Sequence, residues 1–187
     1  FDGPEQLPGR SVCGVVFSNE LLDAFPVTRL RWTSRDRQWL EAGVAAAGAG
    51  FSWVWRTADP GRAAALLRMS GLEIPEELAA VLPDEFTLDL AEDAGHWWRA
   101  AAEALGRGRL MTIDYGCLAE GLLDPSRADG TLRGYQNHRP IRDVLADPMT
   151  LGKPTGRDVA LGRPSSATEK GLTGAVQHFD RLVACAT

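Results

Sequence analysis

A short acidic stretch near the start of the chain contains residue types that could do chemistry. It follows an apolar run, VCGVVF at residues 12–17, which predicts a fully buried strand of a parallel sheet. Ser18, Asn19 and Glu20 come next, at the carboxyl end of the strand, the edge where open α/β sheets bind ligands. Asp23 lies three residues beyond Glu20, so the two carboxylates would share one face of a short helix. Two acidic groups on one face could together bind a positively charged group.

A simpler interpretation gives these residues only a structural role. Ser18 or Asn19 would cap the short helix, and Glu20 and Asp23 would lie in its first turn, where the helix dipole favours anions. Either carboxylate alone fits both interpretations, whereas the whole combination after a buried strand is more specific. The face opposite the carboxylates would consist of Leu21, Leu22 and Phe25.

A second strand is predicted to end at the same crevice. Residues 109–113 are predicted to form another buried strand, and Asp114 and Tyr115 follow it directly. Tyr115 could line an opening for a substrate, whereas Asp114 could merely cap a turn.

A third polar segment, residues 131–139, contains Arg133, Tyr135 and His138. The segment is too short to bury all three side chains, so composition alone predicts a loop whose polar groups are satisfied. The unperturbed pKa of His138 makes this side chain a ready acid or base near neutrality.

Three of these stretches, in this order, resemble motifs of one known family. They are SNELLDAFPV at residues 18–27, LMTIDYG at 110–116 and GTLRGYQNH at 130–138. They are similar to the signatures of the MidA-like family of S-adenosylmethionine-dependent methyltransferases, whose mitochondrial members methylate arginine on a subunit of respiratory complex I. The resemblance runs over almost the whole chain.

The resemblance implies a fold, a cofactor and a division of the chain. The fold class is α/β, a partial Rossmann-like class I methyltransferase with a parallel sheet, and the cofactor is S-adenosylmethionine. Residues 1–28 and 109–187 would form the methyltransferase core, and residues 29–108 an inserted β-meander with a helical region on the substrate side. Ser18 and Asn19 would contact the cofactor.

The resemblance also assigns roles at the strand ends. Glu20 and Asp23 would grip the planar guanidinium of an arginine substrate and favour loss of its proton, while Asn19 would hydrogen-bond between cofactor and substrate. Asn19, Glu20 and Asp23 are therefore the expected catalytic residues. The residues expected to bind the substrate are Tyr115, Tyr135 and His138.

Two other functions fit the same sequence. One is an O-methyltransferase that acts on a small metabolite, with His138 as general base. The other is a degenerate, non-catalytic methyltransferase module that works as an assembly factor or binds a protein. Relative to the family, the sequence lacks a strand and glycine-rich turn before Val12 and stops before the last strands, so we expect a fragment.

The remaining segments give predictions of secondary structure. Alternating apolar residues over 27–56 predict an antiparallel meander, whose tryptophans cover a sheet or helix more plausibly than they bind a cationic ligand. The dipeptide Asp59-Pro60 predicts the start of a helix. Further helices are predicted after Pro75, over 94–105 and over 175–185, and a mobile connection over 143–171.

Composition excludes some classes of function. The 187 residues are 44% hydrophobic and 24% charged, which is globular, and the net charge of −5 argues against a general nucleic-acid binder. No stretch approaches membrane-spanning length, and no metal site is expected. Cys13, Cys117 and Cys185 are predicted to be buried free thiols of a cytoplasmic protein.

Overall fold

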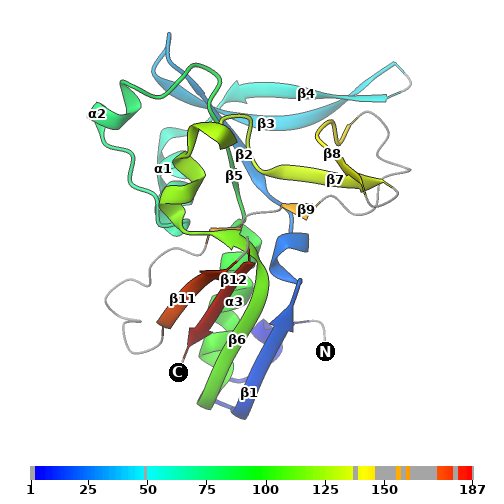
Figure 1. Ribbon diagram of the computed structural model, residues 1–187, viewed down its shortest axis with the longest axis vertical. Helices are drawn as coiled ribbons and strands as arrows, with labels where there is room; N and C mark the ends of the chain where they lie inside the picture. The colour runs from blue at the N-terminus through cyan, green and yellow to red at the C-terminus, as the bar shows by residue number, and fades with distance from the viewer. Residues whose placement is uncertain are drawn as a thin grey trace.

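The computed structural model contains two main β-sheets, one above the other along the long axis of the molecule (Figure 1). The α/β fold with a parallel strand pair and an additional antiparallel sheet is therefore confirmed. None of the helices in the described part of the chain is long and apolar enough to cross a lipid bilayer. The structure describes residues 3–48, 50–136, 139–145, 155–156, 159–160, 172–178 and 181–186.

The lower sheet holds the predicted parallel pair. Its strands, in spatial order, are β1 (Val12–Asn19), β6 (Leu105–Cys117), β12 (Arg181–Ala186) and β11 (Leu172–His178), with β10 (Val159–Ala160) pairing the end of β6. Strands β1 and β6 run parallel, with Ser18 opposite Thr112, whereas β12 runs antiparallel to β6. Both predicted strand ends therefore lie at the same edge of one sheet.

Three predictions about this sheet are wrong. Strand β1 is not fully buried, because within the described residues it pairs only with β6 and is an edge strand; Val15 is 64% exposed and Phe17 is 53% exposed. Cys13 on the same strand is exposed as well, whereas Cys117 is buried as expected. The predicted closing helix over 175–185 is instead the antiparallel pair β11 and β12. The open edge of β6 offers β12 a ladder of backbone hydrogen bonds, which overrides the local helical pattern.

The upper sheet confirms the predicted meander. Its strands, in spatial order, are β4 (Gly50–Thr57), β3 (Gln38–Ala47), β2 (Thr28–Thr33) and β5 (Thr87–Leu90). Leu30 and Trp32 alternate into the core on β2, and the Trp32 ring stacks on Trp39 with centroids 5.3 Å apart. On the other face, Arg29 and Arg31 lie over the indoles of Trp53 and Trp55. The tryptophans thus cover the sheet and its own arginines.

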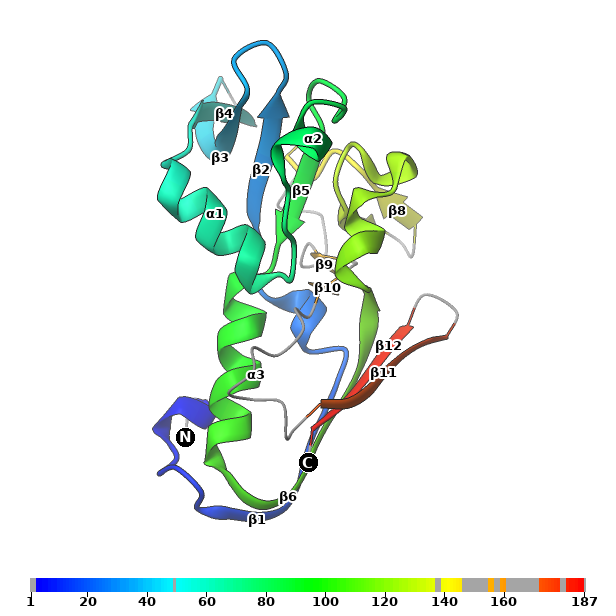
Figure 2. The same cartoon turned by 90° about the vertical axis from the view of Figure 1, so that its left-hand side faces the viewer.

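Helices cover one side of each sheet (Figure 2). The helices are α1 (Pro60–Met69), α2 (Glu76–Ala79) and α3 (Glu92–Ala104). Helix α1 begins as predicted at Asp59, whose side chain accepts a hydrogen bond from the Arg62 amide at 2.8 Å. Helix α3 packs on the lower sheet through Ala101, which contacts the Leu110 cluster. It leads directly into β6 at Leu105, so this strand starts earlier than predicted.

The remaining elements are short. They are the 3₁₀ helices η1 (Pro4–Gln6), η2 (Leu22–Ala24), η3 (Ala119–Leu123) and η4 (Pro125–Arg127), and the strands β7 (Leu132–Gln136), β8 (Arg139–Ile141) and β9 (Thr155–Gly156). The segment 131–139, predicted to be a loop, contains β7 and the start of β8, and these two strands pair antiparallel. Most of the predicted mobile connection over 143–171 lies outside the described residues.

Glycines allow a close backbone approach between β1 and β6. Gly14 and Gly108 face each other in the parallel ladder, and both have a φ of 145°. A side chain at Gly108 would collide with the carbonyl of Gly14. Only glycine fits position 108, because any Cβ would meet backbone that cannot move aside.

We expect Asp59→Ala to lower the free energy of unfolding by about 1 kcal/mol, because the Arg62 amide loses its capping acceptor. Chemical denaturation measures the change. Asp36→Ala, in the exposed turn between β2 and β3, is the control and should leave the midpoint almost unchanged. Equal effects of the two substitutions would show that the cap contributes nothing.

Candidate functional site

The carboxyl ends of β1 and β6 are joined by a hydrogen bond between two buried hydroxyls. Ser18 and Thr112 occupy paired positions in the parallel register, and their side-chain oxygens lie 2.5 Å apart. This hydrogen bond therefore connects β1 and β6 just before β1 leaves the sheet.

Asp114, on β6, holds the turn that follows β1. Its carboxylate accepts hydrogen bonds from the backbone amides of Leu21 (3.0 Å), Leu22 (2.7 Å) and Tyr115 (2.8 Å). The first two amides open η2, and no side chain of the local sequence caps that helix. The prediction that Ser18 or Asn19 caps the helix is therefore wrong, because an aspartate 92 residues away in sequence satisfies its first amides.

Glu20 lies before the helix and not in its first turn. Its amide donates to the carbonyl of Ile113 at 2.9 Å, which extends the β1–β6 ladder by one residue. Its φ is +48°, a left-handed conformation that a non-glycine residue rarely adopts, and its side chain is exposed. The predicted helix of one or two turns starting at Glu20 is thus a single 3₁₀ turn, Leu22–Ala24. Strained backbone of this kind is concentrated at functional sites.

Asp23 is the buried member of the acidic pair. The residue is 6% exposed, and its carboxyl group hydrogen-bonds that of Asp114. Burial raises the pKa of Asp23 from 3.8 to about 6, and the negative charges of Asp114 and Glu20 contribute to the same rise. The structure therefore brings the two predicted carboxylates together with a third, so that their charges repel one another.

The other predicted site residues lie at different distances from this cluster. Asn19 is exposed at the end of β1, and Tyr115 is half-buried beside Asp114 on β6. Tyr135 is half-buried on β7, in a separate sheet. His138 lies outside the described residues. The hydroxyl of Ser18 is hydrogen-bonded to that of Thr112, and Ser18 is buried.

From the sequence, Asp114 is predicted only as a possible turn cap, and Thr112 is not predicted as a functional residue. Asp114 does cap a turn, but the turn follows β1 and not its own strand, β6. A signal for both residues is present, because two parallel strands that each end in a run of polar residues place those residues in register. Ser18 with Thr112 is such a pair.

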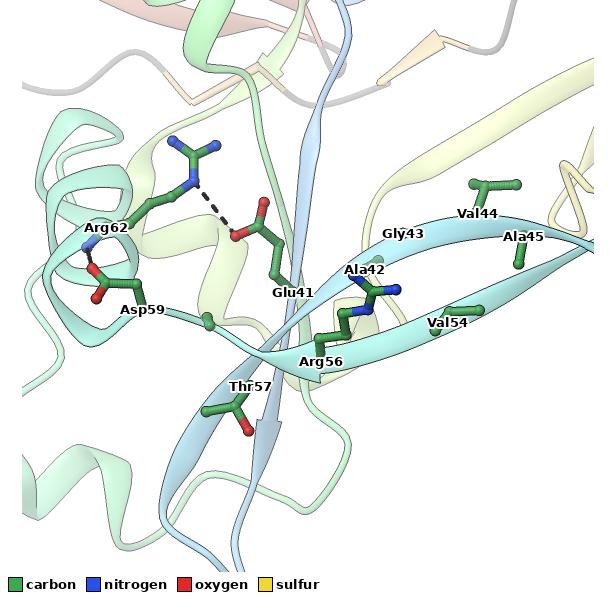
Figure 3. Close-up of a pocket in the computed structure, with 11 residues that line it drawn as sticks. Glu41, Ala42, Gly43, Val44, Ala45, Val54, Arg56, Thr57, Asp59 and Arg62 are labelled. Carbon is green, nitrogen blue, oxygen red and sulfur yellow. Dashed lines mark hydrogen bonds and ion pairs between the residues drawn. The ribbon is translucent and has the colours of Figure 1, made fainter.

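A hollow elsewhere on the molecule lies beside the upper sheet (Figure 3). It has a volume of about 450 Å³ and lies between β3, β4 and the start of α1. Arg62 Nε lies 3.4 Å from a carboxylate oxygen of Glu41 across it. None of the predicted site residues lines this hollow. The chemistry-bearing cluster is thus at the strand ends and not on the meander.

The chain is similar to one protein family and to solved structures from one bacterium. The sequence matches, over residues 3–151, the family described as "Putative S-adenosyl-L-methionine-dependent methyltransferase". A crystal structure from Burkholderia thailandensis, of a protein bound to S-adenosyl-homocysteine, is 28% identical, with a TM-score of 0.66 over 82% of this chain and 36% of that one. Comparison with curated proteins gives no match.

A second crystal structure from Burkholderia thailandensis, of an uncharacterized protein of the same superfamily, supports the fold alone. It is 23% identical, with a TM-score of 0.76 over 97% of this chain and 56% of that one. The chain therefore spans between about a third and just over half the length of these solved structures. Because the family match covers far more than half of its residues, the chain belongs to this S-adenosylmethionine-dependent methyltransferase family.

Proposed function

We propose that the protein transfers a methyl group from S-adenosylmethionine to an arginine side chain of a protein substrate. The observation that supports this proposal is the acidic cluster at the joined ends of β1 and β6, where the buried carboxyl of Asp23 lies beside Asp114 and the charge of the exposed Glu20 also raises the pKa of Asp23. A site that concentrates negative charge, and raises the pKa of one acid to about 6, is relieved when a cation enters.

The three carboxylates have two different proposed roles: one holds the backbone turn, and the other two bind the substrate. Asp114 uses its oxygens on three backbone amides, so its role is to place the turn. The clamp for a guanidinium then falls to Glu20 and Asp23. A guanidinium is planar and permanently charged, and its forked donors match carboxylates in a bidentate manner.

The cluster also fits the cofactor, because its charge favours a sulfonium as well as a guanidinium. When bound, S-adenosylmethionine supplies the methyl group. Asn19, at the exposed end of β1, and Ser18, one residue earlier, are the proposed cofactor contacts. Glu20 and Asp23 hold the acceptor nitrogen in line with the methyl group, and positioning of this kind accounts for most of the rate.

Asp23 is the proposed proton acceptor. Methylarginine remains cationic, so the attacking nitrogen must lose one proton as its bond to carbon forms. With a pKa of about 6, the Asp23 carboxyl is mostly ionised at neutral pH and is a stronger base than an ordinary aspartate. The proton therefore has a nearby acceptor within the same cluster.

We also propose that the protein belongs to the MidA-like subfamily of these methyltransferases. The support for this assignment is the order of the three motifs and the position of two of them at the joined strand ends. Tyr115, Tyr135 and His138 are the proposed acceptor-side residues, and residues 29–108 the proposed insertion that carries part of that side.

Radiolabelled S-adenosylmethionine and the protein, added together to cell extract, test the proposal. We expect label in a protein band and methylated arginine in its peptides by mass spectrometry. Label only in small metabolites would replace arginine with a hydroxyl or carboxyl acceptor. No label, together with no heat of S-adenosylmethionine binding in calorimetry, would indicate a non-catalytic assembly or protein-binding module.

A further inference from the structure

The upper sheet contains an ion pair that is shielded from water. The side chain of Asp89, on β5, is 0% exposed, and that of Arg29, on β2, is 12% exposed. Arg29 Nε donates to Asp89 Oδ1 at 2.8 Å, and its Nη2 donates to Oδ2 at 3.3 Å. Desolvation of two charges offsets most of their attraction, so such a pair is a poor source of stability. The role of this ion pair follows from the backbone groups to which Arg29 and Asp89 are also hydrogen-bonded.

Those groups belong to a segment about forty residues further along the chain. Asp89 Oδ2 accepts hydrogen bonds from the amides of Thr131 (2.6 Å) and Leu132 (2.8 Å). Arg29 Nη2 donates to the carbonyl of Asp129 at 2.9 Å. The pair therefore fastens the start of β7 to the upper sheet.

Gly130 completes this arrangement. Its φ is +83°, and a side chain there would collide with the carboxylate of Asp89 and come within 2.7 Å of Arg29 Nη2. The ion pair can reach the backbone only because position 130 has no Cβ. We call Arg29, Asp89 and Gly130 the β7 clasp.

The segment held by the clasp leads toward the acidic cluster. Strand β7 begins at Leu132, carries Tyr135, and pairs with β9. Strand β9 in turn contacts η2, the single turn that bears Asp23 (Figure 1). The clasp thus lies at one end of a series of backbone contacts whose other end is the candidate site.

We propose that the β7 clasp positions the acceptor side of the methyl-transfer site. By fixing where β7 begins, it sets where Tyr135 stands relative to η2 and Asp23. This inference rests on the proposed function and deepens it: Arg29 and Asp89 are positioning residues that act through β7, and they do not touch the reacting atoms.

Arg29→Lys and Gly130→Ala in the full-length protein are the test variants. Lysine keeps the charge of Arg29 but loses its fork, whereas an alanine methyl at position 130 pushes the segment away and keeps both charges. With N-acetyl-arginine amide as acceptor mimic, we expect kcat/KM for the mimic to fall about tenfold or more. The Kd for S-adenosylmethionine should stay unchanged, and the amides of Thr131 and Leu132 should exchange hydrogen faster.

Arg31→Lys is the matched control. Arg31 lies on the same strand and face, over Trp55 at 4.0 Å, but its partner Glu85 is exposed and the pair holds no distant backbone among the described residues. We expect this variant to keep wild-type kcat/KM for the mimic. A loss equal to that of Arg29→Lys would overturn the clasp, because any lost arginine would then have the same effect.

Binding of the mimic, measured by calorimetry with S-adenosyl-homocysteine present, separates the clasp from the proposed function. A wild type that binds the mimic but transfers no methyl group refutes the function, and weaker binding by Arg29→Lys still supports the clasp. Faster exchange at Thr131 and Leu132 without any change in binding or kcat/KM overturns the clasp. A wild type that neither binds nor methylates the mimic overturns both.

Discussion

Glu20→Gln in the full-length protein should lower the rate of methyl transfer about 100-fold or more. Glutamine has nearly the same shape, so the left-handed backbone and the ladder bond to Ile113 remain. What is lost is one negative charge that would offset and orient the acceptor cation. We therefore expect kcat for the acceptor to fall while the Kd for S-adenosylmethionine changes less than about twofold, as single-turnover kinetics and calorimetry can show.

Glu85→Gln is the matched control for this experiment. Glu85 is another glutamate with a left-handed backbone, with a φ of +63°, and its side chain pairs with Arg31 at the surface. The neutral substitution there should leave both turnover and cofactor affinity unchanged. If Glu20→Gln also left turnover unchanged, Glu20 would have no role in the reaction, and its conformation would need a purely structural explanation.

Asp23→Asn should make the protein more stable and less active at the same time. The pKa of Asp23 is raised from 3.8 to about 6, so the native state holds this proton more tightly than the unfolded state does. Stability is therefore lost as the pH rises from 3.8 through about 6, and the full penalty is present above that range. Asparagine carries no charge and avoids the penalty, which we place at roughly 1–3 kcal/mol.

Thermal melts at several pH values measure the effect. The variant should melt higher than the wild type at about pH 7 to 8, and the difference should shrink as the pH falls and disappear well below 3.8, where the wild-type carboxyl is protonated in both states. Asp36→Asn, at an exposed turn position, should show no such gap. Loss of methyl transfer is expected as well, because the amide cannot accept the proton. A lower melting point for Asp23→Asn at neutral pH would contradict the repulsion among the three carboxyls.

Local signals predict those parts of the fold that local chemistry determines. The cap at Asp59 and the alternation around Leu30 and Trp32 each act within a few residues, and both are found as predicted. The two polar strand ends are also predictable, because an apolar run that stops at Ser18 or at Asp114 marks the edge of a sheet.

Partners distant in sequence determine the parts that local signals miss. Residues 175–185 have a pattern compatible with a helix, and only the open edge of β6 makes them a strand pair. The helix after Glu20 is a single turn, and the amides of Leu21 and Leu22 at its start donate hydrogen bonds to the carboxylate of Asp114 on β6. The polar ends of the two strands indicate that Asp114 lies near the turn after β1, but no local pattern shows which backbone amides it binds or that residues 175–185 pair with β6.

The facing glycines of β1 and β6 have a consequence for experiments that rank positions by their sensitivity to substitution. Gly108 stands at the opposite end of the strand from Asp114, yet every replacement would drive a Cβ into the carbonyl of Gly14. Such a scan would score Gly108 as severely as a reacting group, although it carries no functional atom. Intolerance at Gly108 would reflect the close packing of two strands, and a sensitivity map read alone would point to the opposite end of the sheet from the candidate site.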